Sequence, residues 1–206
     1  MAKYIKMILV LSIIALTSGL VLGGLNEITY ETVQNNVLKF KKIPAVASIY
    51  ESIKGKIPQE NRANVEAELL AERKEVNIGE EKPLLVFVIK KDDKPYAVAF
   101  EKFGGGFGGD LGVMVGYELN SGDIAAIGIT TMSETPGLGT MVKEKSFLAQ
   151  FTGLSKDATL MVKKDGGEID AVSGATVSSR AVIQAANLTK ALYNKHQDTI
   201  KTEINK

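Results

Sequence analysis

The chain has 206 residues, which is enough for one domain with a substantial core beside a short additional segment. Its 25 Lys and Arg residues nearly balance 24 Asp and Glu residues, so the net charge of +1 gives no argument for a nucleic-acid or other polyanionic partner. The absence of Cys excludes disulfides, thiol catalysis and iron–sulfur ligation within the chain, and the single histidine, His196 in the polar C-terminal tail, leaves little for zinc, haem or Ser-His-Asp chemistry.

An apolar run without charge, Met7–Leu25, stands near the start of the chain. At about 20 residues it is long enough to span a bilayer as a helix. A cleavable signal peptide is the alternative, because Lys3 and Lys6 make a basic start and small residues follow. The run continues past those small residues, so we expect an uncleaved anchor. Lysines before the run, with Glu27 and Glu31 after it, predict a cytoplasmic N-terminus and an extracytoplasmic body.

Beyond the anchor, which we assign to residues 1–25, we expect a helical connecting region at residues 26–82. Its first part mixes polar residues with apolar ones at helical spacing, which predicts a helix that continues out of the membrane and is broken by Pro44. The stretch Ile49–Lys56 is expected to form a short second helix. The charged residues that follow are expected to be a solvated face rather than a binding patch.

Residues 83–206 carry the strand patterns and are assigned to one domain. Two pairs of short apolar runs, each pair joined by turn residues, predict two β-hairpins. The four runs are Leu84–Ile89, Tyr96–Phe100, Val113–Leu119 and Ile124–Met132. A helical pattern follows from Arg180 onward. Antiparallel strands with flanking helices predict an α+β fold, preceded by a single N-terminal transmembrane helix.

The glycine-rich stretch Gly104–Gly109 formally satisfies G-x-G-x-x-G, the dinucleotide-binding fingerprint. That fingerprint requires a helix to start at its glycines, whereas the residues from Gly112 onward have a strand pattern. No Lys-Ser or Lys-Thr pair follows to make a P-loop. We therefore interpret this stretch as a flexible turn and not as a nicotinamide site.

The loop Glu134–Gly139 follows a predicted strand and interrupts it with Pro136, Gly137 and Gly139. The interruption leaves backbone amides free to face a ligand, and glycine allows a backbone to approach a flat ring closely. Thr135 can hydrogen-bond to a polar edge of such a ring. Without further information, an ordinary turn explains the loop equally well.

Hydroxyl residues gather at the expected start of the last helix, in the stretch Asp170–Ser179. A helix N-terminus presents unpaired amides and the positive end of the helix dipole, so it favours an anion such as phosphate. Gly174 permits close approach of the backbone, and a hydroxyl can contact phosphate or be esterified to it. The alternative is that the Ser and Thr side chains simply cap the helix.

The run Asp-x-x-Ser-Gly-Ala-Thr-x-Ser-Ser resembles the covalent-flavinylation motif of the FMN-binding domain family. This family includes the G subunit of Rnf complexes and the C subunit of Na⁺-translocating NADH:quinone reductases. The resemblance implies that Thr176 carries FMN through a phosphoester bond. Asp170, Ser173, Gly174 and Ala175 occupy the matching motif positions.

The loop Glu-Thr-Pro-Gly-Leu-Gly resembles a second segment of the same family, which lies against the flavin. The residues that the resemblance assigns to the flavin site are Glu134, Thr135, Gly137, Leu138 and Gly139. A glycine-rich approach like that at residues 104–109 precedes this loop in the family, which implies Phe107 as a neighbour of the ring. No metal site is expected.

The resemblance implies an electron-transfer subunit with covalent FMN in a membrane-bound Rnf complex, with no complete activity of its own. Such a complex couples ferredoxin:NAD⁺ electron transfer to Na⁺ or H⁺ translocation. The implied partners are the flavin-bearing D subunit, the iron–sulfur-bearing A and E subunits, and a flavin transferase that installs FMN from FAD. The implied location is the cell membrane, with a single pass and the flavin domain outside the cytoplasm.

Other functions remain open. The chain has less sequence between anchor and motif than the quinone-reductase subunit usually has, which favours Rnf over a quinone-reductase C subunit. A stand-alone, membrane-tethered flavoprotein that reduces an extracellular acceptor would act on soluble partners without a stable membrane complex. A non-redox scaffold would have no flavin, and its Ser and Thr residues would only cap the helix.

Overall fold

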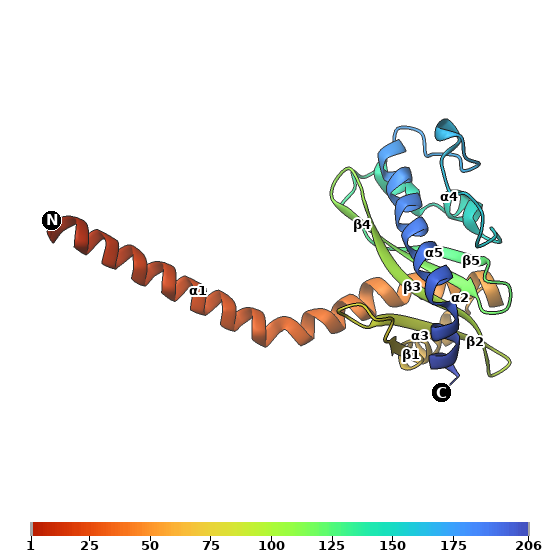
Figure 1. The fold of residues 1–206 in the computed structure, drawn as a ribbon, viewed down its shortest axis with the longest axis horizontal. Helices are drawn as coiled ribbons and strands as arrows, with labels where there is room; N and C mark the ends of the chain where they lie inside the picture. Colours follow the sequence, from red (N-terminus) through yellow and green to blue (C-terminus); the bar gives the residue numbers. More distant parts are fainter. Residues whose placement is uncertain (1, 206) are drawn as a thin grey trace. The chain divides into compact units, whose positions relative to one another are not determined.

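The computed structural model describes residues 2–205 and divides them into two units, residues 2–40 and residues 41–205. The first unit consists of a long helix, α1 (Ala2–Val37), and the first residues of the π-helix that follows it (Figure 1). The large apolar side chains from Tyr4 to Val33 are exposed. Within the described residues, the helical segment that starts at Lys3 is the one long and apolar enough to cross a membrane. The apolar pattern from which we expected an anchor therefore lies on a helix of sufficient length.

A π-helix, Leu38–Lys42, follows α1, and α2 (Ile43–Lys54) follows the π-helix without a break in the helical path. The expectation that Pro44 breaks the helix is therefore wrong. Pro44 lies in the first turn of α2. A first-turn residue needs no intrahelical partner for its N–H group, so the missing donor of proline costs little there. The short second helix expected after Pro44 is the C-terminal part of α2.

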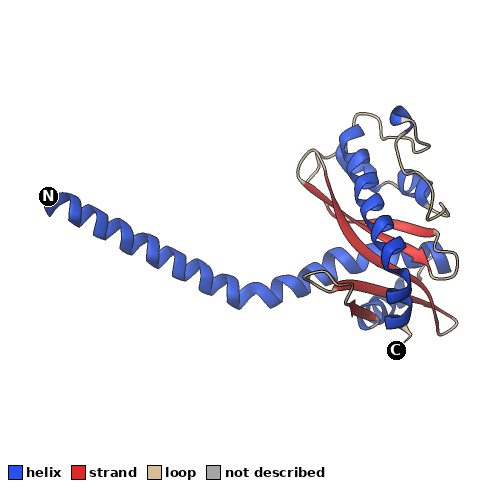
Figure 2. Cartoon of the chain, in the orientation of Figure 1, coloured by secondary structure: helices blue, strands red, loops and turns tan. Residues whose placement is uncertain are grey.

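One antiparallel sheet, drawn in red in Figure 2, organises the second unit. Its strand order among the described residues is β1-β2-β3-β4-β5. Its strands are β1 (Arg73–Val76), β2 (Leu84–Lys91), β3 (Lys94–Gly105), β4 (Asp110–Glu118) and β5 (Ile124–Thr131). The four predicted strands correspond to β2–β5, and the predicted α+β class is confirmed. Strand β1 was not predicted, because four residues with the sequence Arg-Lys-Glu-Val have no strand pattern on their own.

Helices cover both faces of the sheet. The chain has α3 (Arg62–Ala71) before the sheet, and α4 (Lys145–Leu148) and α5 (Thr176–Ile204) after it. Three short 3₁₀ helices flank α4 and precede α5, at Gly139–Lys143, Ala149–Phe151 and Lys163–Asp165. Helix α5 packs on β3 and β4, and α2 packs on β5 and β4 (Figure 1). Because successive strand residues point to opposite faces, the continuous apolar runs of these strands suit a sheet buried on both sides.

Residues on the two faces confirm this arrangement. Val98 and Tyr117 are paired across β3 and β4 and belong to the same apolar core cluster as Val182 and Ala186 of α5. On the other face, a Cβ atom at Gly116 would lie 2.6 Å from Cγ2 of Ile49 in α2. The sheet is thus the middle layer between α2 and α5.

Tyr117 is the centre of the core beneath α5. Its ring stacks on the ring of Tyr193, with 4.4 Å between the centroids, and its hydroxyl lies 2.9 Å from Oγ1 of Thr189. The Thr189 hydroxyl donates to the carbonyl of Ala186, so Tyr117 acts as the donor to Thr189. Burial raises the pKa of the Tyr117 phenol far above its ordinary value of 10.0.

This burial predicts a loss of stability in alkali. Below pH 10 the phenol is protonated in both the folded and the unfolded state, so its full contribution to stability is present. Because the pKa is raised in the folded state, the unfolded state ionises first as pH rises, and this contribution is then lost. Tyr117→Phe should lower the free energy of unfolding at pH 8 by about 1 kcal/mol, through loss of one hydrogen bond. Above pH 10 the free energy of unfolding should fall with pH less steeply in the variant than in wild type. The two slopes should differ by about 1.4 kcal/mol per pH unit.

Urea unfolding at a series of pH values measures both effects. Burial also raises the pKa of Tyr193, so the variant should retain part of the alkaline loss. Parallel stability–pH curves for wild type and Tyr117→Phe would contradict the prediction.

The glycine-rich stretch lies at the tip of the β3–β4 hairpin. Pairing between the two strands extends to Gly105 and Asp110, so strands lie on both sides of the turn and no helix starts at its glycines. The turn predicted from the sequence is confirmed. A Cβ atom at Gly104 would lie 2.0 Å from the carbonyl oxygen of Ala181, so the absence of a side chain lets β3 approach α5 closely.

Candidate cofactor-binding site

The two sequence motifs meet at one cavity of about 370 Å³. The loop after β5 supplies one side, the first turn of α5 with the two residues before it supplies the other, and the β3–β4 tip closes the rim. The lining residues are Phe107, Glu134, Thr135, Leu138, Gly139, Gly174, Ala175, Thr176, Val177 and Ser178. Segments about 40 residues apart in the sequence therefore form a single site.

Glu134 holds the three sides of the cavity together. One carboxylate oxygen accepts from the backbone N–H groups of Phe107, at 2.9 Å, and of Gly108, at 3.4 Å. The other oxygen accepts from the Ser178 hydroxyl at 2.9 Å. Glu134 is only 7% exposed, and buried carboxylates need such donors to offset lost hydration. The carboxylate is thus engaged by protein donors at both of its oxygens.

The first turn of α5 is not capped by a side chain. Helix α5 begins at Thr176, and Ala175, with φ −130° and ψ 38°, takes the N-cap position, where it has no side chain that could accept a hydrogen bond. Among hydrogen bonds of residues 2–205, none engages the backbone N–H groups of Thr176, Val177 or Ser178. Three donors and the positive end of the helix dipole therefore remain for a ligand, which disfavours simple capping as the role of the Ser and Thr residues.

The four hydroxyl residues near this helix start have different environments. Ser178 and Ser179 are buried and engaged: Ser178 donates to Glu134, and Ser179 donates to the Ala175 carbonyl and accepts from the Val172 amide. Ser173 is exposed, and it does not line the cavity. Thr176 is half-buried, it lines the cavity, and its hydroxyl has no hydrogen-bond partner within the described part of the chain. Among these four hydroxyls, that of Thr176 is the one that combines access to the cavity with freedom from competing bonds in the described chain.

The loop beside the cavity is shaped by its two glycines in different ways. Gly137 has φ +75°, a left-handed conformation that favours glycine, and its N–H donates to the Thr140 hydroxyl at 2.9 Å. At Gly139, a Cβ atom would lie 2.4 Å from Oε2 of Glu134 and 2.8 Å from the Ser178 hydroxyl oxygen. Gly139 thus allows the loop to pack directly against the first turn of α5.

The rim of the cavity is apolar and accessible. Phe107 is 76% exposed, and Leu138 and Val177 are each about half exposed. Apolar side chains on an open rim suit a flat aromatic ligand that remains partly accessible.

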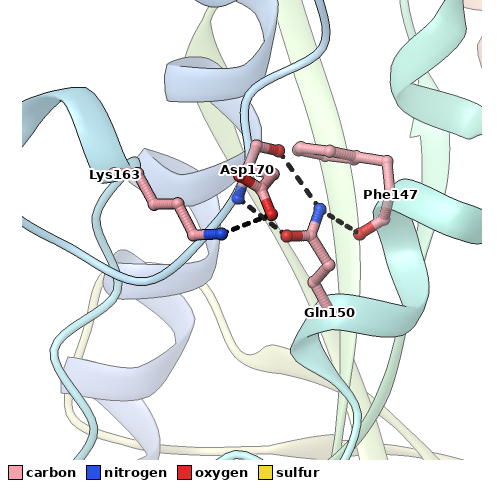
Figure 3. Close-up of polar contacts among 4 residues, drawn as sticks. All are labelled: Phe147, Gln150, Lys163 and Asp170. Atoms are coloured by element: carbon pink, nitrogen blue, oxygen red, sulfur yellow. Dashed lines mark hydrogen bonds and ion pairs between the residues drawn. The ribbon is translucent and has the colours of Figure 1, made fainter.

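Asp170 does not line the cavity, and its polar contacts are with Lys163 and Gln150 (Figure 3). Its carboxylate accepts from Nζ of Lys163 at 2.7 Å, and both polar groups of its backbone bind the side chain of Gln150. Gly137, Ser173 and Asp170 are therefore the three residues of the predicted site that do not line the cavity.

Arg180, one turn into α5, is paired with Asp165. Its Nε and Nη2 atoms each lie 2.7 Å from a different oxygen of that carboxylate. The hydrogen bonds from Arg180 lower the pKa of Asp165, and those to Asp165 raise the pKa of Arg180. The cation nearest in sequence to Thr176 is thus already neutralised, which leaves the helix terminus as the main attraction for an anion.

Comparisons with known proteins show which family the chain resembles. Residues 106–190 match the FMN-binding domain family. This part of the chain is similar to the FMN-binding domain. The family resemblance inferred from the two motifs is thereby confirmed, and the match includes the hairpin tip, the loop and the first turns of α5.

The chain is also similar to curated relatives that are named as the G subunit of an ion-translocating oxidoreductase complex. The relative from Shewanella piezotolerans is 29% identical over 130 residues, which are 60% of this chain and 61% of that protein. The relative from Vibrio cholerae is 30% identical over 135 residues, 62% of this chain and 64% of that protein. The matched segments thus span less than two thirds of these two proteins. The relative from Shewanella loihica is 26% identical over 197 residues, 92% of this chain and 89% of that protein.

A solved structure also resembles the chain. It is the C subunit of a Na⁺-translocating NADH-quinone reductase from Parabacteroides distasonis, with a TM-score of 0.57, 22% sequence identity, and coverage of 72% of this chain and 88% of that one. This similarity supports the fold of the second unit, an antiparallel sheet covered by helices.

The residues at the cavity fit FMN. Unpaired amides at a helix N-terminus suit its phosphate, and an apolar open rim suits its ring system. Because Gly139 has no side chain, the loop can pack closely against Glu134 and Ser178 at the cavity wall. Val177 and Ser178 were not among the predicted site residues. Their positions in the first turn of the expected helix could have indicated them, because amides of that turn point at a bound anion.

Proposed function

We propose that the chain is an electron-transfer subunit of a membrane-bound Rnf-type ion-translocating oxidoreductase, and that FMN is attached to it through a phosphoester bond at Thr176. One observation carries the proposal: the free hydroxyl of Thr176 and three unpaired amides lie in the first turn of α5, at a cavity also lined by the second motif. The similarity to G subunits supports it. No complete activity is expected from the chain alone.

The proposal gives each side of the cavity a role. The amides of the first turn of α5 would stabilise the negative charge of a phosphodiester, with Ser173, Gly174 and Ala175 shaping the approach to Thr176. The loop residues Thr135, Gly137, Leu138 and Gly139 would lie against the ring. Bound FMN supplies the redox chemistry, because flavins exchange electrons singly or in pairs.

Glu134 and Asp170 have supporting roles in the proposal. The carboxylate of Glu134 is engaged by three protein donors, so it would keep the hairpin tip, the loop and α5 in register rather than bind the cofactor through free lone pairs. Asp170 starts the segment that leads to Thr176 and would act through the conformation of that segment.

The proposed partners follow from the complex. They are the flavin-bearing D subunit, the iron–sulfur-bearing A and E subunits, and a flavin transferase that uses FAD. The complex would couple ferredoxin:NAD⁺ electron transfer to Na⁺ or H⁺ translocation. We assign residues 1–25 to the anchor, 26–82 to the connecting region and 83–206 to the FMN-binding domain, which would lie outside the cytoplasm.

Intact-mass measurement of the chain tests the proposal. The chain is produced with and without an active flavin transferase, purified, and denatured before the measurement. We expect the mass to increase by one FMN moiety only when the transferase is present, and the other membrane subunits to co-purify in mild detergent. Covalent flavin without co-purifying subunits would instead favour a stand-alone flavoprotein.

The proposed topology gives a separate prediction. A protease added outside intact cells or right-side-out vesicles should cut the chain after Leu25, because the lysines before the anchor favour a cytoplasmic N-terminus. Immunoblotting measures the loss of the full-length band, and a cytoplasmic protein should stay intact in the same sample. Complete protection of the chain, while an external control protein is digested, would reverse the orientation.

A further inference from the structure

The segment Asp170–Ala175 connects the bridge at Ile169 to α5 and leads directly into Thr176. At its C-terminal end, the Val172 amide donates to the Ser179 hydroxyl, and the Ala175 amide donates to the Val172 carbonyl, each at 3.0 Å. The first bond ties that end of the segment to α5, and the second closes a turn within the segment. We refer to residues 170–175 as the acceptor segment.

The N-terminal end of the acceptor segment is held by a side chain from a distant part of the chain, Gln150 (Figure 3). Oε1 of Gln150 accepts from the Asp170 amide at 2.7 Å, and Nε2 donates to the Asp170 carbonyl at 3.1 Å. Nε2 also lies 3.4 Å from the carbonyl oxygen of Phe147 in α4. A carboxamide offers a donor and an acceptor in one plane, so it pairs with both backbone groups of one residue as a neighbouring strand would.

The ion pair between Lys163 and Asp170 is a weaker tie. Its side chains are 58% and 65% exposed, and exposed ion pairs contribute little because water screens them. Gln150 is half-buried, and the neighbouring Phe147 and Phe151 are buried in the core. Loss of the Gln150 amide should therefore free the start of the acceptor segment without removing the apolar contacts that stabilise the fold.

We propose that Gln150 is a positioning residue for flavin attachment, and this inference rests on the proposed function. By binding both backbone groups of Asp170, its amide holds the acceptor segment in the conformation that presents Thr176 to the transferase. In the attachment reaction, the Thr176 oxygen bonds to the FMN phosphorus of FAD, the pyrophosphate bond breaks, AMP leaves with the bridging oxygen, and the transferase takes the hydroxyl proton. No electrons are transferred.

The test measures the rate of flavin attachment to the full-length chain in detergent. Purified transferase and FAD are added at several concentrations of the chain, and samples are followed by flavin fluorescence on denaturing gels. Gln150→Leu keeps the size of the side chain and removes its polar contacts, so kcat/KM for the chain should fall by roughly tenfold. Gln150→Glu retains the acceptor and loses the donor, so its rate should lie between those of wild type and Gln150→Leu. Lys163→Met is the control, with a rate within about twofold of wild type.

A second readout separates positioning from general damage. Gln150 does not line the cavity, so Gln150→Leu that has been flavinylated to completion should have the absorption spectrum and reduction potential of wild type. A changed spectrum or potential would overturn the inference. If Gln150→Leu lowers the melting temperature, the attachment rate of Gln150→Glu relative to that of wild type becomes the test of the positioning role.

The outcomes also distinguish the two proposals. Wild type that is modified at Thr176, together with a Gln150→Leu rate equal to wild type, would overturn the role of Gln150 alone. Wild type that stays unmodified beside an active transferase would overturn the proposed function and this inference with it.

Discussion

Thr176→Val should abolish covalent flavin completely. The hydroxyl of Thr176 is the bond-forming group in the proposed linkage, and the neighbouring hydroxyls of Ser178 and Ser179 are buried and hydrogen-bonded. They are therefore poorly placed to substitute. Because the Thr176 side chain does not cap α5, the variant loses no capping bond, and its free energy of unfolding should change by less than about 1 kcal/mol.

Fluorescence of the denatured protein on a gel measures attachment, and mass spectrometry of the peptide containing Asp170–Arg180 identifies the modified residue. Thr135→Val is the matched control, since it removes a hydroxyl from the same cavity by the same substitution. It should retain covalent flavin. A Thr176→Val protein that still carries covalent flavin would show that the attachment site is wrong.

Gly139→Ala should disrupt the cavity more than any other single added methyl group in the loop. The new Cβ atom would lie 2.4 Å from Oε2 and 2.7 Å from Cβ of Glu134, distances that require a backbone or side-chain shift. The shift would separate Glu134 from Ser178 and release the hairpin tip at Phe107. Overpacking of this kind costs about 1 to 3 kcal/mol of stability. We expect a lower melting temperature and, in flavinylated protein, an altered flavin spectrum.

Gly105→Ala provides the control for this experiment. Gly105 is the last residue of β3, two positions before Phe107 of the cavity rim, and a Cβ atom there would meet nothing within 4 Å. Its melting temperature and spectrum should stay close to those of wild type. Gly137 is a different case, because a Cβ atom has room there and only the positive φ opposes substitution. Equal stability and identical spectra for Gly139→Ala and Gly105→Ala would contradict the prediction.

The elements of this fold were largely predictable from local sequence. Strands β2 to β5, the hairpin turn at the glycines and helix α5 follow from apolar periodicity and turn residues, which depend on neighbours a few positions away. The two errors have local causes as well. Strand β1 has no apolar pattern, and the sequence does not reveal that Pro44 falls in the first turn of a helix rather than in its interior.

The site was only partly predictable. Both motifs were found because each is contiguous, and the family resemblance placed them at one flavin. Their mutual arrangement depends on contacts between distant residues: Glu134 binds Ser178 and the amide of Phe107, and Gln150 binds Asp170. No local pattern encodes such pairs, since each side chain on its own could equally face solvent.

The sequence by itself thus determined the apolar helix near the N-terminus, the antiparallel strands, the position of the last helix and the threonine at its start, because periodicity and motif spacing are properties of neighbouring residues. Only the tertiary structure decided which hydroxyl is free. Ser178 and Ser179 are engaged because the loop and the preceding segment fold back onto α5, while the hydroxyl of Thr176 stays without a protein partner in the described chain. The physical reason is that hydrogen-bond satisfaction depends on the packing of distant segments against one another.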